Sequence, residues 1–483
     1  MNAPTPAAHL APVVQARHVP QAFLDALKTR FGDNCSTALV VREQHGRDES
    51  AFPPVRPSAV VMASTTEEVS RVLKYCNEQR IPVVAFGAGS SLEGHVLPLH
   101  GGVSLDLTPM NKIIEIRPDD LLGFTLSSLA KKIPNLDLDR VDDVMIGDSN
   151  GAGEDNRNVA RMGSLLAGFP VTIPGVTINR LCGSGAEAII QASRAIRSGD
   201  SDYIIAGGVE VMSRAPWIVE RTSKEEPTNP VFNQSTVGWR LTNPLFPAHW
   251  TASLGRCSEE VAERFNISRQ AQDEWAHRSH QLAAAAWDKK LHEGFVVPFG
   301  DVTKDESIRA DGTLEKLASL PSVFSENGAG TAGNSSPLND GSVTMLITDR
   351  AGTDNLGLTG IGRILGAQVT ATNPNEFTLA PVSAIHKVLA RTGKKFSDIK
   401  VWEINEAFAS MVLTVLHEVP EIDLAKVNIN GGSIAIGHPV GASAARVVVD
   451  CARELKRQGG GIGIAAACIG VGLGVAIVVE VKG

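Results

Sequence analysis

The chain has 483 residues, of which 43% are hydrophobic, and a formal net charge of −8. That length exceeds what one hydrophobic core usually organises, so we expect two or three domains. An acidic chain without a basic stretch argues against nucleic acid as the main partner, although a few local donors can still hold an anionic small ligand.

Six cysteines are spread along the chain without a C-x-x-C pair, a pattern typical of reduced thiols in a cytoplasmic protein. Residues 1–19 are rich in Ala and Pro and are expected to form a flexible tail without the features of a secretory signal. Residues 461–481 are apolar and about as long as a membrane span. Their glycines and β-branched residues instead favour two buried strands joined by a turn.

The elements fall into two sets in chain order. The first set comprises a helix at 20–31, a strand at 59–63, a helix at 65–80 that opens on Thr65, and strands at 81–86 and 101–107. An amphipathic helix at 118–134 begins the second set, in which strands and helices alternate to the end and predict stacked α/β layers. Residues 215–330 are more polar and contain few strand-like runs, which indicates a large insertion.

The segment NRLCGSGAEAII places Cys182 between an apolar strand and a helix. Unpaired N–H groups and the positive end of the helix dipole favour a thiolate there, which is the nucleophilic form of cysteine. The alternative is a small buried cysteine in a tight turn.

Three further segments place polar groups at the ends of predicted strands. They carry Asn405 in WEINEAFAS, His438 in GGSIAIGHPVGAS and Cys468 in AAACIGVGLG. An imidazole near a thiol can act as its base. Taken singly, each residue is also consistent with capping or with burial in the core. Together they suit the ligand crevice at the strand ends of an α/β protein.

The motifs NRLCGSG, GGVEVMSRAP, TAGNSSPLNDG, NEAFA, GGSIAIGHPVGAS and CIGVGLG occur in the order and spacing of thiolases. GEDNRNVAR and ISRQAQDEWA fit the same family. From about residue 117 to the end, the chain therefore resembles a thiolase. This resemblance implies two similar βαβ-type halves in stacked α/β layers, a loop domain over the active site, and a homodimer or homotetramer.

The resemblance also implies the residue roles of an acyl-CoA C-acyltransferase. Cys182 takes the acyl group, His438 removes its proton, and Cys468 exchanges a proton with the α-carbon of acetyl-CoA. Asn405 and His438 frame one oxyanion site through a water, and the N–H groups of Cys182 and Gly470 frame the other. Coenzyme A is a substrate and no cofactor is required.

Two residues match positions that contact coenzyme A in the family. Ser336 corresponds to a position beside the pantetheine chain and Arg309 to one beside the adenine. A solvated surface charge remains an equally weighted alternative for Arg309. No metal-ligand spacing is present, and His277 and His280 in WAHRSH are expected on the surface. Two segments, ERTSKEEPTNPVF and TVGWRLTNPLF, are similar to degradative or 3-oxoadipyl-CoA thiolases.

Residues 20–117 are different and resemble the start of the FAD-binding domain of D-lactate dehydrogenase and glycolate oxidase, an α+β fold. The similar segments are REQHGRDESAFPP, RPSAVVMASTTEEVSRVL, PVVAFGAGSSLEGHVLP and GGVSLDLTPMNKIIEI. The resemblance implies FAD contacts at Gly87, Gly89, Ser90, Ser91, Gly94 and His95. It ends near residue 117, before the rest of that domain, so stable FAD binding is not expected.

The thiolase part lacks the opening strand that ends in Arg-Thr-Pro, which we expect in the middle of the first half's sheet. Its loss predicts unpaired edges on two neighbouring strands, and residues 102–110 are a candidate replacement. Val471 also stands where the family has a glycine, which threatens the Gly470 turn if φ is positive there.

The expected organisation is a tail at 1–19, a flavin-domain fragment at 20–117, and thiolase halves at 118–352 and 353–483, the first containing the loop domain at about 215–330. The expected function is thiolase activity in the cytoplasm, without nucleic acid or membrane partners. A catalytically impaired fusion and a fragment of a FAD-dependent 2-hydroxy acid dehydrogenase remain alternatives.

Overall fold

The computed structural model describes residues 19–48, 52–87, 89, 95–110, 117–220 and 230–483. The chain divides into two compact units, Met1–Ile114 and Glu115–Gly483, each with its own hydrophobic core.

The smaller unit is an α+β fragment built around one sheet. Its elements are α1 (Gln21–Phe31), β1 (Cys35–Ser36), α2 (Leu39–Gln44), β2 (Ala59–Met62), α3 (Thr66–Glu78), β3 (Val83–Phe86) and β4 (Val103–Asp106). The strand order is β1-β2-β4-β3, with β2, β4 and β3 parallel. The expected Thr65 cap is present, because its side chain accepts the Glu68 N–H at 3.2 Å.

Strand β4 corrects one expectation. All four of its residues are buried between β2 and β3, so the segment 102–110 does not replace the missing thiolase strand. Its apolar pattern suits any fully buried parallel strand, and the pattern alone did not say which sheet it joins.

The larger unit consists of two halves of similar topology and an insertion. The first half contains α4 (Pro118–Lys132), β5 (Asp143–Gly147), α5 (Val159–Leu166), β6 (Gly175–Ile178), α6 (Ser184–Ser198), β7 (Tyr203–Val211), β10 (Asp340–Thr348) and α10 (Arg350–Asn355). The second half contains β11 (Arg363–Ala371), α11 (Ala380–Thr392), β12 (Ile399–Ile404), α12 (Ala409–Glu418), α13 (Ser433–Ile436), α14 (Val440–Arg457), β13 (Gly461–Ile469) and β14 (Leu473–Val481).

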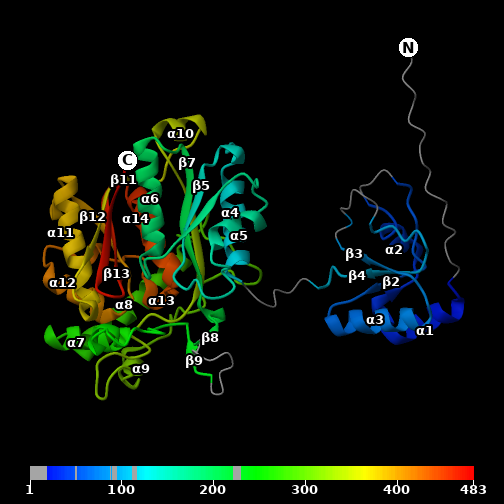
Figure 1. The fold of residues 1–483 in the computed structure, drawn as a ribbon, viewed down its shortest axis with the longest axis horizontal. Coiled ribbons are helices and arrows are strands. Elements are labelled where there is room, and N and C mark those ends of the chain that lie inside the picture. Colours follow the sequence, from blue (N-terminus) through cyan, green and yellow to red (C-terminus); the bar gives the residue numbers. More distant parts are fainter. Residues whose placement is uncertain (1–18, 49–51, 88, 90–94, 111–116, 221–229) are drawn as a thin grey trace, which may run out of the picture. The chain divides into compact units, whose positions relative to one another are not determined.

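The two sheets of this unit have the orders β10-β7-β5-β6 and β11-β14-β13-β12. Figure 1 shows α6 and α14 packed between them, with α4 and α5 outside the first sheet and α11 and α12 outside the second. This layering confirms the expected α/β fold class. The apolar stretch 461–481 forms β13 and β14, two antiparallel buried strands, and no helix of the described residues is long and apolar enough to cross a membrane.

The central helices approach each other closely. A Cβ added at Gly185 of α6 would lie 2.8 Å from the Ala445 side chain and 2.8 Å from the Gly441 carbonyl oxygen on α14. Only a glycine permits this approach, which brings the start of α6 next to the start of α14.

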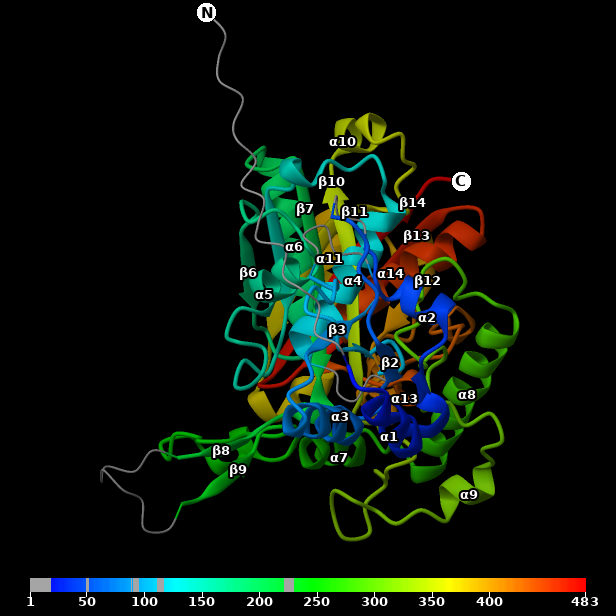
Figure 2. The same cartoon turned by 90° about the vertical axis from the view of Figure 1, so that its right-hand side faces the viewer.

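The insertion leaves the first half after β7. It contains β8 (Trp217–Val219), β9 (Phe232–Gln234), α7 (Leu254–Arg264), α8 (Arg269–Asp288) and α9 (Leu314–Ala318). In Figure 2 the β8–β9 hairpin projects from the body of the unit, while α7 and α8 lie against it. Helix α8 contacts α12 and α13 of the second half, so the insertion covers the strand ends that carry the expected site.

The consequence expected from the missing strand is only partly right. The strands expected to flank a central gap, β5 and β7, pair directly in parallel over five residue pairs. The equivalent strand of the second half, β11, lies at the edge of its sheet beside β14. The vacant position is therefore at the edge beyond β10, and one strand rather than two lacks a neighbour.

Candidate active site

Cys182 lies between β6 and α6, immediately before Gly183, the N-cap residue of that helix. Its side chain is buried. The residue before it, Leu181, has a φ of +48°, a left-handed conformation that is uncommon for a residue with a side chain and that recurs at functional turns. A Cβ at Gly183 would come within 2.3 Å of the Ile469 side chain, so the glycine lets this turn sit against β13.

Burial dominates the electrostatics of the Cys182 thiol and raises its pKa to about 11. The nearby backbone N–H groups of Gly470 and of Cys182 itself act in the opposite direction and lower the pKa. The N–H groups thus favour the thiolate as expected, but burial outweighs them. These are the two N–H groups expected to form the oxyanion pair.

His438 lies between α13 and α14 and is held by Ser443. The Ser443 hydroxyl donates its one proton to the Pro439 carbonyl at 2.9 Å, so its contact with His438 Nδ1 at 2.7 Å makes Nδ1–H the donor. Nε2 is then the unprotonated nitrogen. Burial, aided by the positive charge of Arg446, lowers the pKa of His438 to about 4, which keeps the ring neutral at physiological pH.

Asn405 follows β12 and lies beside His438, with Nδ2 at 3.4 Å from Nε2. Ser433 donates to Asn405 Oδ1 at 2.6 Å and accepts from Arg446 at 2.9 Å. Arg446 in turn pairs with Asp450 at 2.6 Å. This chain of contacts fixes the orientation of the amide, so that its NH₂ group faces the imidazole.

Cys468 is a fully buried residue near the end of β13. Burial is the main cause that raises the pKa of its thiol, and the nearby charge of Cys182 raises it further. The two thiols therefore lie close enough to interact. Asn405 N–H donates to Ala466 of the same strand at 2.9 Å, which ties the His438–Asn405 pair to the strand that carries Cys468.

The turn after Cys468 is strained. Val471 has a φ of +58°, where a β-branched side chain is a clear outlier. This confirms that the position favours a glycine, and it places the strain directly beside the Gly470 N–H.

A buried carboxylate connects the insertion to the site. Glu406 accepts from Trp275 at 3.0 Å and Ser279 at 2.7 Å on α8, and from the Ile434 N–H at 3.1 Å in α13. It also accepts from Asn428 at 2.9 Å. Glu406 thus holds the insertion against the loops that carry Asn405 and His438.

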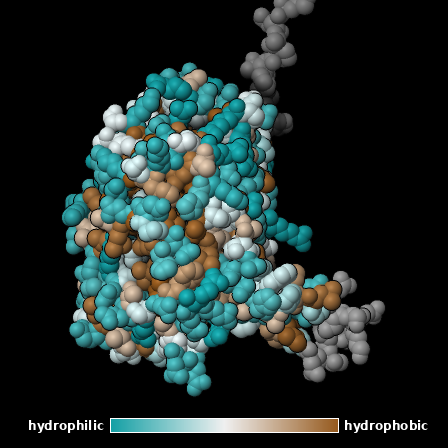
Figure 3. Space-filling view, turned by 90° about the vertical axis from the view of Figure 1, so that its left-hand side faces the viewer, coloured by the Kyte–Doolittle hydropathy of each residue, from teal (hydrophilic) through white to brown (hydrophobic). Residues whose placement is uncertain are grey.

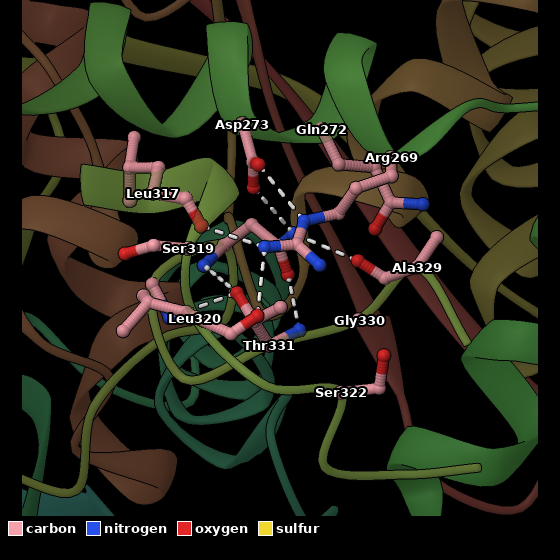
Figure 4. Close-up of polar contacts among 12 residues, drawn as sticks. Arg269, Gln272, Asp273, Leu317, Ser319, Leu320, Ser322, Ala329, Gly330 and Thr331 are labelled. Carbon is pink, nitrogen blue, oxygen red and sulfur yellow. Dashed lines mark hydrogen bonds and ion pairs between the residues drawn. The ribbon is translucent and has the colours of Figure 1, made fainter. Parts of the chain in front are cut away.

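A second network, shown in Figure 4, orders the segment TAGNSS. Arg269 pairs with Asp273 at 2.8 Å and also bonds the Leu317 and Leu320 carbonyls. Asp273 accepts from Asn334 at 2.9 Å, and the Asn334 carbonyl accepts from the Ala409 N–H at 2.9 Å. The segment is therefore fixed between α8 and the corner that follows Asn405.

The two residues expected at coenzyme A lie on this covering layer. Ser336 bonds the Ala407 carbonyl through both its N–H and its hydroxyl, each at 3.1 Å. Arg309 is exposed, and its N–H donates to His280 Nδ1 at 3.2 Å. His280 is buried, which corrects the expectation that it lies on the surface. No cluster of three potential metal ligands occurs among the residues that the structure describes.

The expected flavin contacts are only partly located. Gly87 and Gly89 follow β3, and Gly89 has a φ of +71° that suits a tight turn. Ser90, Ser91 and Gly94 lie outside the described residues, and His95 follows them. The described residues thus place two of the six expected contacts, Gly87 and Gly89, in one turn after β3.

The thiolase N-terminal domain profile matches residues 103–351, and the thiolase C-terminal domain profile matches residues 358–481. The chain belongs to the thiolase family. A FAD-binding domain profile also matches residues 57–122, so both families overlap on β4 and α4. Family membership confirms the expected acyltransferase class.

Relatives and solved structures agree with this assignment. The chain is 43% identical to the 3-oxoadipyl-CoA/3-oxo-5,6-dehydrosuberyl-CoA thiolase of Escherichia coli K12, over 76% of this chain and 94% of the relative. It is 38% identical to the beta-ketoadipyl-CoA thiolase of Pseudomonas knackmussii, over 85% of this chain and 100% of the relative. The Bacillus anthracis acetyl-CoA acetyltransferase structure superposes with a TM-score of 0.71 at 36% identity, over 76% of this chain and 93% of that one.

The first half of the larger unit contains three buried carboxyl groups, Asp148, Asp155 and Glu210. Glu210 accepts from the Ser149 and Gly441 N–H groups, each at 2.9 Å. Burial, followed by the negative charges of Glu210 and Asp155, raises the pKa of Asp148 well above its ordinary range. We infer that Asp148 is protonated at neutral pH and hydrogen bonds the Glu210 carboxylate.

The substitution Asp148→Asn tests this arrangement. Because the folded-state pKa is raised, the folded chain binds more protons than the unfolded chain, and stability falls as pH rises from about 4 through the folded pKa. The variant has no carboxyl group to ionise at this position. The difference in unfolding free energy, variant minus parent, should therefore be larger at pH 9 than at pH 6. Urea denaturation measures this, with exposed Asp301→Asn as the control. An equal effect at both pH values would contradict the assignment.

Substitution of Val471 by glycine should relieve the turn beside Gly470. The expected gain in unfolding free energy is about 1 kcal/mol, since a left-handed conformation costs a residue with a side chain about 1–2 kcal/mol. Val471→Ala removes the branching but keeps a Cβ, and should gain less. Thermal unfolding of the three proteins checks the order, which would be refuted if the alanine variant equalled or exceeded the glycine variant.

Proposed function

We propose that this thiolase cleaves a 3-oxoacyl-CoA that carries a terminal carboxylate, with coenzyme A as second substrate, to acetyl-CoA and a shortened acyl-CoA. The observation that carries the proposal is the convergence at Cys182. Gly470 N–H faces its sulfur, Cys468 lies beside it, and the His438–Asn405 pair is tied to the same strand.

The first half-reaction forms the acyl-enzyme. His438 Nε2 takes the Cys182 proton as the sulfur attacks the 3-keto carbon. The bond between C2 and C3 then breaks, and the electron pair left on C2 takes the proton of Cys468, which releases acetyl-CoA. The raised pKa of Cys182 and the lowered pKa of His438 disfavour a resting ion pair, so the proton moves only as the new S–C bond forms.

The second half-reaction restores the enzyme. The Cys468 thiolate takes the proton of the coenzyme A thiol, whose sulfur attacks the acyl group on Cys182. Cys182 leaves and recovers its proton from His438. The N–H groups of Gly470 and Cys182 stabilise the oxyanion of each tetrahedral state, and each such donor is typically worth about 3–4 kcal/mol. Ser336 and Arg309 are proposed contacts of coenzyme A.

Arg240 supports a carboxylate-bearing substrate. Its neighbour Trp239 lies against the turn after Cys468, 3.2 Å from where a Cβ of Gly470 would be. The Arg240 guanidinium is half-buried and donates to Asn150 at 2.8 Å. Within the described ranges, no carboxylate lies at ion-pair distance from it. A guanidinium without an ionic partner suits a substrate carboxylate, and several relatives are named for 3-oxoadipyl substrates.

A homo-oligomer in the cytoplasm is the expected form of this enzyme. Exposed apolar side chains gather on and after the projecting hairpin, including Trp217, Phe232, Leu245 and Phe246. Figure 3 shows hydrophobic surface on this projection at the lower right of the view. Exposed apolar patches of this kind mark contacts with other protein chains.

A catalytically impaired fusion is the second candidate, and the unpaired edge of β10 favours it. If the open edge loosens the first half, the Cys182 turn loses its alignment while the second half remains intact. Activity of the purified chain distinguishes the two candidates.

The first functional prediction concerns the nucleophile. The parent should cleave 3-oxoadipyl-CoA in the presence of coenzyme A. The loss of the enolate absorbance of the substrate measures this reaction. Cys182→Ala should lose about 10³-fold or more in kcat, whereas Cys76→Ala, in the smaller unit, should keep full activity. A folded parent that cleaves no 3-oxoacyl-CoA would overturn the proposal in favour of the impaired fusion.

The second functional prediction concerns substrate choice. Arg240→Met should lower kcat/KM for 3-oxoadipyl-CoA by about 10- to 100-fold, the equivalent of one charged hydrogen bond, and leave acetoacetyl-CoA cleavage nearly unchanged. For Arg240→Lys, kcat/KM for 3-oxoadipyl-CoA should lie between the values of the parent and of Arg240→Met. Equal losses on both substrates would show that Arg240 has a structural role and does not recognise the carboxylate.

A further inference from the structure

The two halves of the larger unit provide an internal comparison. The strands β5, β7 and β10 of the first half correspond in order and direction to β12, β13 and β14 of the second. The helices α4, α5 and α6 correspond likewise to α11, α12 and α14. The strand β11 has no counterpart in the first sheet, although it pairs with β14 along almost its whole length.

Within the part of the chain that the structure describes, one edge of β10 has no neighbouring strand. Its inner edge pairs with β7 over nine residues. No described residue outside that pair makes a backbone hydrogen bond to β10. All nine residues of β10 are partly exposed, whereas β14, which has strands on both sides, is mostly buried.

The open edge carries none of the usual protection. Natural sheets protect an exposed edge with lysine, proline, bulges or a short strand. β10 reads DGSVTMLIT, nine residues without lysine or proline, and its register with β7 is unbroken. Its single charge is Asp340 at the first position. Such an edge can form main-chain hydrogen bonds with an added strand.

Helices on both faces of β10 define which strand fits there. Val343, Met345 and Ile347 pack into the core with α6 and α14, while Leu346 packs into the core beneath α4. On β11, Ile364, Ala367 and Val369 enter one core and Leu365 the other. A strand in the vacant position therefore needs uncharged, mainly apolar residues on both faces.

We propose that the open edge of β10 binds an extended peptide strand of another protein, antiparallel to β10, in the place that β11 takes on β14. Among the described residues, β4 is already paired on both sides within the smaller unit and is not free to take this place. By analogy with the pairing of Ala371 with Leu473, the carboxyl end of the bound strand lies opposite Asp340. A neutral or basic end is therefore favoured over a carboxylate.

The test uses the full chain and a synthetic peptide with the sequence of Arg363–Ala371, amidated at its carboxyl end. Two control peptides carry N-methyl groups, one on the odd-numbered amides and one on the even-numbered amides. Because alternate amides of a strand point to opposite sides, only one control should lose binding, measured by fluorescence anisotropy of the labelled peptide. Hydrogen exchange should slow by about tenfold or more at Asp340–Thr348 and not at the edge of β11.

Three results would overturn the proposal. They are that the unmodified peptide does not bind, that both methylated controls bind as well as the unmodified peptide, or that hydrogen exchange slows at residues away from β10. A fourth is an oligomer whose β10 amides become protected as protein concentration rises and which excludes the peptide. In that case a second copy of the chain, and not a foreign strand, covers this edge. Activity plays no part in these measurements, so their outcome is separate from that of the proposed reaction.

Discussion

The close contact between α6 and α14 is the constraint on which the candidate site depends. Gly185 lies three residues after Cys182, and Gly441 lies three residues after His438. A side chain on Gly185 would collide with the Gly441 carbonyl, and a Cβ on Gly441 would lie 2.4 Å from the Val209 carbonyl. These glycines let the beginnings of the two helices meet at the ends of two separate sheets. Cys182 and His438, 256 residues apart in sequence, therefore lie at the starts of two helices that touch, without either being carried on a long loop.

Burial is the main influence on the pKa values of the candidate site residues. Both thiols have raised pKa values and His438 a lowered one, in each case mainly because the charged form loses its contact with water. Burial therefore favours the neutral form of each of these three groups before the proposed reaction begins. Fixed dipoles then matter more than fixed charges: the Gly470 N–H, the Asn405 amide held by Ser433, and the imidazole held by Ser443. Their orientation is set before the substrate arrives, which is the condition for effective transition-state stabilisation.

Sequence reasoning identified the residues that react more readily than those that hold them. Cys182, Asn405, His438 and Cys468 stand in distinctive glycine-rich or corner motifs, and their place at strand ends could be predicted. Ser443 and Arg446 are one helical turn and two turns along α14 from the helix start, a spacing that every helix contains, so nothing marked them. Strand β5 was also missed, because it follows Asp142, begins with Asp143 and is only five residues long. The sheet joined by β4 could not be predicted, since a buried strand of only four residues, Val103–Asp106, fits either sheet.

The internal repeat explains how a thiolase fold can persist without its first strand. An inner strand takes part in two ladders, so its loss would leave two edges open and separate the helices packed on its faces. The position of β11 shows that the missing strand belongs at an edge, where its loss removes one ladder and leaves β5 and β7 paired. The Cys182 turn depends on β6, α6 and the Gly470 turn, all on the far side of β7 from that edge or in the second half. The missing strand therefore affects the edge of the sheet, which tolerates a loss better than its centre. The consequence is that β10 has a neighbouring strand on one side only among the described residues.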